Sequence, residues 1–109
     1  MEDTINFNNG HRKRIREKFL QSGLDGFLDY EVVELLLTLG TPRKDCKQIA
    51  KDAIKKFKSL KGVLEADITR LTSVKGIGPS NVLGLILFQA IYERYSKEKI
   101  SAIPSLKGE

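Results

Sequence analysis

The chain has 109 residues, 40% of them hydrophobic and 30% charged, and a formal net charge of +5, which fits one globular domain of average composition. Its single Cys46 excludes an internal disulfide and, together with the single His11, a zinc site built from several Cys or His ligands, so we expect a cytoplasmic domain without catalytic zinc. The longest strictly apolar run, Leu85–Phe88, is far shorter than the ~20 residues that a membrane-spanning helix needs.

The first half of the chain predicts three helices. Residues 1–9 show no periodicity and are expected to form a flexible arm. A helix is predicted over His11–Ser22, with apolar residues on one side, basic residues on the other, and Gly23 at the position of a C-terminal glycine. The second helix, from Asp29 to Leu39, is apolar nearly all round and should be central, and the third begins with Asp45 as its N-cap.

The second half predicts two short helices and one long helix. Ser59–Ala66 should form a helical turn, Asp67 should cap the next short helix, and the long helix should begin at Pro79, because proline is accepted at the first helical position. Seven apolar residues predict that this long helix is strongly buried: Leu83, Leu85, Ile86, Leu87, Phe88, Ile91 and Tyr95. Residues 100–109 are expected to be a linker or a frayed tail. No alternating pattern predicts a strand, so we expect an all-α fold, a compact bundle of five to six helices over residues 10–99.

One segment between two predicted helices points to a ligand. Residues 74–79 have the sequence Val-Lys-Gly-Ile-Gly-Pro, in which Gly76 and Gly78 permit positive φ and remove Cβ atoms from one surface. Backbone N–H groups can then approach an anion, and the following helix adds unpaired N–H groups and the positive end of its dipole. Ile77 should point inward and pin the turn to the core. The pattern predicts phosphate binding without base reading, which suits sequence-independent DNA binding.

A lone Gly-x-Gly is also typical of a simple tight turn, so its surroundings matter. Leu71 and Val74 precede the glycines, a helix with many apolar residues follows, and Lys75 adds a cation beside the loop. A dinucleotide-binding fingerprint is disfavoured, because no strand precedes the glycines and Asn81 stands where a third glycine would be required. A P-loop is excluded, because the sequence contains no Gly-Lys-Ser or Gly-Lys-Thr.

Several segments carry a resemblance to known proteins. Residues 71–80 (Leu-Thr-Ser-Val-Lys-Gly-Ile-Gly-Pro-Ser) are similar to a helix-hairpin-helix DNA-binding motif, and residues 57–66 resemble the lead-in of paired motifs in repair nucleases. Gly-His-Arg-Lys-Arg-Ile-Arg-Glu-Lys-Phe at 10–19, Asp-Tyr-Glu-Val-Val-Glu-Leu-Leu-Leu at 29–37 and Pro-Arg-Lys-Asp at 42–45 resemble the N-terminal domain of the bacterial RadC family. The resemblance covers nearly the whole chain.

The resemblance implies one part of a longer protein. RadC-like proteins carry a C-terminal JAB/MPN-type domain with a zinc-binding His-x-His and Asp signature, which is not found in this sequence. Any metallopeptidase-like activity would therefore belong to that domain, and this chain would be an N-terminal domain without catalysis of its own. The family name also implies a role in DNA repair, but it implies no particular mechanism.

The helix-hairpin-helix resemblance implies particular site residues. Phosphate oxygens would meet backbone N–H groups of Gly76, Gly78 and Ser80. Together with the neighbouring positions, the residues that the resemblance implies in DNA binding are Lys75, Gly76, Ile77, Gly78, Ser80 and Asn81. Some such motifs also hold a monovalent cation on hairpin carbonyl groups, and no other cofactor is implied. The matching carbonyl groups are those of Thr72, Val74 and Ile77. Bulky residues in place of both Gly76 and Gly78 should weaken binding without unfolding the bundle.

Two more basic segments are candidates for DNA contact. The connection Leu39–Asp45 sits where the first hairpin of a pair would be, and it could contact phosphates through Arg43 and Lys44. An ordinary helix–helix connection explains this segment equally well. The basic run of the first helix could also contact phosphates, although such runs are usually solvated faces: Arg12, Lys13 and Arg14.

Two functions remain open from the sequence. The leading hypothesis is a non-catalytic, sequence-independent DNA-binding module whose partner is duplex or branched DNA. The rival is a protein-interaction or intramolecular docking domain that keeps the fold without binding DNA. A base-excision glycosylase is rejected, because it would need a catalytic aspartate well downstream of the hairpin and no Asp follows Asp67. An aromatic content of 7% argues against binding by base stacking.

Overall fold

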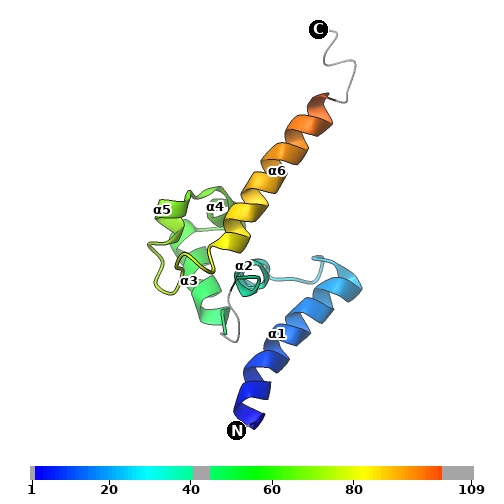
Figure 1. The fold of residues 1–109 in the computed structure, drawn as a ribbon, viewed down its shortest axis with the longest axis vertical. Coiled ribbons are helices and arrows are strands. Elements are labelled where there is room, and N and C mark those ends of the chain that lie inside the picture. Colours follow the sequence, from blue (N-terminus) through cyan, green and yellow to red (C-terminus); the bar gives the residue numbers. More distant parts are fainter. Residues whose placement is uncertain (1, 41–44, 102–109) are drawn as a thin grey trace.

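The computed structural model describes residues 2–40 and 45–101, and this part of the chain contains six helices and no strand (Figure 1). The helices are α1 (Glu2–Ser22), α2 (Asp29–Thr38), α3 (Lys47–Phe57), α4 (Leu60–Glu65), α5 (Ile68–Leu71) and α6 (Leu83–Ser101). The predicted all-α fold of five to six helices is confirmed. Within the described ranges, no helix combines the length and the apolar character that a membrane crossing requires.

Helix α2 lies at the centre of the fold. It packs most extensively against α3 and also contacts α1, α4 and α6. Helices α3, α4 and α5 gather beside it, whereas the long helices α1 and α6 extend beyond this core in opposite directions (Figure 1). The larger core side chains with no exposed surface come from five different helices or their ends: Val33, Leu37, Cys46, Val63, Leu71 and Leu85. Each large apolar side chain buried there contributes about 1.5–3 kcal/mol to stability.

Helix α6 is much less buried than its sequence predicts. Of its seven apolar residues, Leu85 is fully buried and Ile86 is partly buried, but Leu87, Ile91 and Tyr95 are 48–58% exposed. The helix also begins at Leu83 and not at Pro79, because residues 79–82 form a turn. Only the first turns of α6 reach the core, so the expectation of a strongly buried helix was wrong.

Local side-chain chemistry fixes several helix ends. The Asp67 carboxylate accepts a hydrogen bond from the N–H of Arg70 at 2.8 Å, which confirms the predicted cap of α5. Gly23 has a φ of 69°, and its N–H donates to the carbonyl of Phe19, which confirms the predicted C-terminal glycine of α1.

Two predicted helix starts differ from the structure. Helix α1 begins at Glu2 and not at His11, so it includes the segment expected to be an arm. Helix α3 begins at Lys47, after Cys46 in the N-cap position. The Asp45 carboxylate nevertheless accepts a hydrogen bond from the N–H of Lys47 at 2.9 Å, although Asp45 lies one residue before the N-cap position. Residues 102–109 of the predicted tail lie outside the described residues.

Candidate nucleic-acid interface

The turn that connects α5 to α6 is held in place by Gly76 and Ile77. Gly76 has a φ of +97°, a backbone conformation that residues other than glycine rarely adopt. A Cβ atom at this position would also lie 2.8 Å from the side chain of Ile49 in α3. Ile77 is only 4% exposed and joins the hydrophobic core, as the sequence predicts. Ile77 therefore anchors the turn by packing inward, and Gly76 occupies a position that has no room for a side chain.

This geometry corrects one expectation. A bulky residue in place of Gly76 would collide with Ile49, so it would strain the fold as well as any binding surface. Gly78 differs, because its φ is not positive and a Cβ atom there would meet nothing within 4 Å. Of the two glycines, only Gly78 can be replaced to probe the surface without disturbing the core.

Asn81 links the two glycines from inside the turn. Its Oδ1 accepts a hydrogen bond from the N–H of Gly78 at 2.7 Å, and its Nδ2 donates to the carbonyl of Gly76 at 2.7 Å. The residue is 5% exposed. Asn81 therefore belongs to the scaffold of the turn, and the Gly78 N–H, implied as a phosphate donor, already has an acceptor.

Other backbone groups of the turn are available for a ligand. The N–H groups of Lys75, Gly76 and Ser80 have no hydrogen-bond partner among the described residues. Lys75 and Ser80 are exposed, and Gly76 is partly exposed. Of the carbonyl groups implied as cation ligands, that of Val74 accepts the N–H of Ile77 at 3.0 Å. The surface of the turn thus keeps donors for an anion, although not the full set implied by the resemblance.

Gly40, just after α2, lies directly beside this turn. A Cβ atom on Gly40 would be 2.3 Å from the carbonyl oxygen of Ser80, so the two backbones touch. This contact places the first residues of one candidate hairpin against the α5–α6 turn, the other candidate. Arg43 and Lys44 lie outside the described residues.

The basic run of α1 is partly used by the fold. Arg12 is 9% exposed, and its guanidinium donates a hydrogen bond to the carbonyl of Thr38 at 3.3 Å. A cation at this end of α2 also interacts favourably with the helix dipole. Lys13 pairs with Glu17 at 4.0 Å, and Arg14 is exposed. Arg12 is therefore a structural residue that ties α1 to α2.

Sequence reasoning missed two cations beside the turn. Lys56 of α3 donates a hydrogen bond from Nζ to the Oγ of Ser73, which lies within the α5–α6 connection. The guanidinium of Arg70 in α5 lies 5.3 Å from the centre of the Phe57 ring, and Lys56 Nζ lies 5.8 Å from the same ring centre. The sequence signal for them is the excess of basic residues over 53–92, where six Lys and Arg residues stand against Glu65 and Asp67.

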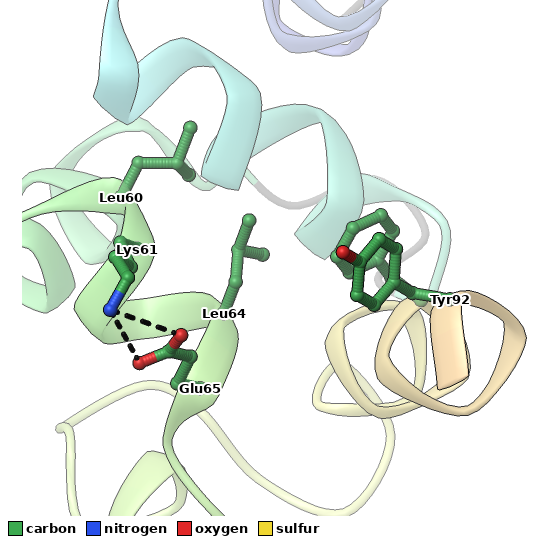
Figure 2. A pocket seen from close by; sticks show the side chains of 6 residues that line it. Leu60, Lys61, Leu64, Glu65 and Tyr92 are labelled. Atoms are coloured by element: carbon green, nitrogen blue, oxygen red, sulfur yellow. Dashed lines mark hydrogen bonds and ion pairs between the residues drawn. The ribbon is translucent and has the colours of Figure 1, made fainter. Parts of the chain in front are cut away.

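A second feature is an apolar groove between α4 and α6, with a volume of about 380 Å³ (Figure 2). Leu60 and Leu64 of α4 line one side, and the stacked rings of Phe88 and Tyr92 of α6, with centres 6.1 Å apart, line the other. An ion pair of α4 lies at its edge, between Lys61 and Glu65. The groove therefore has mostly apolar walls and one charged edge.

Comparison with known proteins places the chain in a family. Residues 8–83 match the family described as UPF0758 N-terminal. A UPF0758 protein of Fusobacterium nucleatum is 51% identical over 80 residues, which cover 73% of this chain and 34% of that protein. UPF0758 proteins of Ruegeria pomeroyi and Rhodobacter capsulatus are each 36% identical, over 83% and 86% of this chain and 40% and 44% of their own lengths. No solved structure gives a significant match.

The chain therefore spans less than half the length of the curated relatives that it matches. The match is confined to the region that the family describes as N-terminal, and it includes α2 to α5 and the turn before α6. This chain belongs to the UPF0758 family, the RadC family of the sequence resemblance, as its N-terminal domain.

Proposed function

We propose that this domain binds DNA without reading its sequence, as the DNA-binding module of a longer RadC-like repair protein. The observation that carries the proposal is the α5–α6 turn. Its backbone is fixed from inside by Ile77 and Asn81, while the N–H groups of Lys75, Gly76 and Ser80 have no partner among the described residues. The turn is then a helix-hairpin-helix element that offers these donors to phosphate oxygens.

Physical chemistry supports this assignment. Backbone N–H groups held in a rigid turn need little reorganisation to meet an anion, and successive donors of this kind form anion-binding concavities. Contacts to phosphate position a protein on DNA but carry no sequence information. The domain needs no cofactor and no catalytic group for this role. A monovalent cation on the carbonyl groups of the turn would add positive charge next to the phosphate.

Lys75→Gln and Gly78→Ala should each weaken the binding of a short duplex. The first removes an exposed cation, and the second places a methyl group on the open surface of the turn, where no protein atom lies within 4 Å. We expect a loss on the order of tenfold for the double variant, and steep weakening for the parent between about 50 and 200 mM salt. Fluorescence anisotropy with labelled DNA measures both effects.

The matched control is Lys99→Gln on the exposed end of α6. It removes the same charge at a site more than ~20 Å along the helix from Leu83, so it should leave affinity nearly unchanged. Thermal unfolding should show that all variants remain folded. If the double variant binds as tightly as the parent, the turn is not the phosphate site.

A docking function is the second candidate, and the exposed apolar side of α6 favours it. Ile91 and Tyr92 are 56% and 62% exposed, and Tyr92 also lines the α4–α6 groove. In this role the domain would bind another part of the longer protein, such as the JAB/MPN-type domain implied by the resemblance.

The docking function predicts that the domain binds the separately produced remainder of the Fusobacterium nucleatum relative, and that Ile91→Lys abolishes this binding. Because Ile91 lies mostly in solvent, the substitution should leave stability within about 0.5 kcal/mol of the parent. Titration calorimetry measures the interaction. Binding of that fragment combined with no salt-sensitive DNA binding would favour docking over the DNA-binding proposal.

A further inference from the structure

We infer that the phosphate-binding surface continues from the α5–α6 turn onto a second pair of cations, Lys56 of α3 and Arg70 of α5. This inference rests on the proposed function and extends it, because neither residue belongs to the hairpin segment from which DNA binding is proposed. The backbone of a duplex would then lie across the turn, α5 and the end of α3, and it would meet side-chain cations as well as backbone donors.

Four contacts place the pair at the edge of the turn. Lys56 Nζ bonds the Oγ of Ser73, and this Oγ in turn donates to the carbonyl of Arg70 at 2.5 Å. Both cationic groups lie over the Phe57 ring, at 5.8 and 5.3 Å from its centre, so they are no more than about 11 Å apart. Both side chains are exposed. Ser73 is only two residues before Lys75, so the pair directly adjoins the turn.

Charge along the chain supports a surface for a polyanion. Residues 53–92 carry six positive charges against the two carboxylates of Glu65 and Asp67, which gives a net charge of +4 of the +5 of the whole chain. Two acidic side chains lie on α3 and at the start of α5, and both accept hydrogen bonds from neutral donors. Asp52 accepts a hydrogen bond from Gln48, and Asp67 accepts one from the N–H of Arg70. Most of the net positive charge of the chain therefore lies between residues 53 and 92, a stretch that includes the turn, α5 and Lys56.

The chemistry of the pair favours a duplex backbone over single-stranded bases. Binding to single strands typically uses exposed aromatic rings on which bases stack. The ring at this site, Phe57, is 8% exposed and lies beneath the two cations. Duplex DNA presents a regular row of phosphates, one per ~3.4 Å of axis along each strand, so two cations that lie no more than about 11 Å apart can both contact phosphates of one strand.

The test is the double variant Lys56→Gln and Arg70→Gln in the full chain. We expect its affinity for a labelled duplex to fall on the order of tenfold at low salt. The slope of log affinity against log salt should flatten by about 2, because each lost phosphate contact removes about 0.9 from the slope. The matched control, Lys97→Gln and Lys99→Gln, removes the same charge at the far end of α6 and should keep the parent's affinity and slope.

The outcomes separate this inference from the proposed function. If the Lys56 and Arg70 variant keeps the parent's slope while the Lys75 and Gly78 variant loses binding, the surface is confined to the turn and the inference is overturned. A single strand of equal length that binds more tightly than the duplex would overturn it too. If the parent shows no salt-sensitive duplex binding, the proposed function fails, and this inference fails with it. Far-UV circular dichroism and thermal unfolding check that each variant is folded.

Discussion

Replacing Gly84 by Ala should lower the free energy of unfolding by about 2–3 kcal/mol, although Ala is the better helix former by about 1 kcal/mol. Gly84 lies in the first turn of α6, where this helix crosses α2. A Cβ atom there would be 2.1 Å from the carbonyl oxygen of Leu36 and 3.0 Å from its carbonyl carbon. These are backbone atoms, so the clash can be relieved only by moving one helix away from the other. Urea unfolding followed by circular dichroism measures the loss.

A matched control is available in α1. Gly10→Ala makes the same change inside a helix, but the new Cβ would meet only the end of the Arg14 side chain at 3.6 Å, an ordinary contact. This variant should be as stable as the parent or up to about 1 kcal/mol more stable. If Gly84→Ala behaves in the same way as Gly10→Ala, then the close crossing of α2 and α6 is incorrect.

Asn81→Ala should destabilise the domain by about 2–4 kcal/mol and should also abolish DNA binding. The substitution removes both 2.7 Å hydrogen bonds that hold the turn, and it leaves the N–H of Gly78 and the carbonyl of Gly76 without their partner. Each buried polar group left unsatisfied costs about 1–3 kcal/mol, and these two hydrogen bonds are partly buried, so the lower part of that range applies to each. The loss of binding follows because the turn no longer holds its donors in a fixed arrangement. Urea unfolding and anisotropy with duplex DNA measure the two effects.

Ser80→Ala is the neighbouring control. Ser80 is exposed, and its side chain makes no hydrogen bond within the described part of the chain, so stability should change by no more than about 0.5 kcal/mol. Asn81→Asp separates the two bonds, because a carboxylate can still accept from Gly78 but cannot donate to Gly76. Its stability should lie between those of the parent and Asn81→Ala. Equal stability of the Asn81→Ala and Ser80→Ala variants would contradict the role assigned to Asn81.

The turn was predictable because its chemistry is local. Two glycines around one apolar residue, with helices on either side, predict a tight turn pinned by Ile77, and the structure has this arrangement. The role of Asn81 was not predictable in the same way. Its side chain bonds backbone groups three and five residues earlier, and the sequence alone does not determine whether an amide turns inward to such groups or outward to a ligand.

The burial of α6 and the pair of cations depended on tertiary structure. An apolar pattern shows that one side of a helix avoids water, but not whether another part of the same chain covers that side. Ile91 and Tyr95 satisfy the pattern and yet remain more than half exposed. Lys56 and Arg70 are separated by 14 positions in the sequence, and they lie over the same ring only because Phe57, at the end of α3, is close to Arg70 of α5.

The contact between Gly40 and Ser80 has a consequence for how the domain is divided. The end of α2 rests directly on the backbone that leads into α6, and Leu36 and Gly84 repeat this close approach one turn away. Each half of the chain therefore supplies the surface on which the other half closes. A fragment ending before α5 would expose the backbone of α2 at Leu36 and Gly40, which the second half of the chain otherwise covers. The first and second halves therefore form a single cooperative unit and not two separable modules.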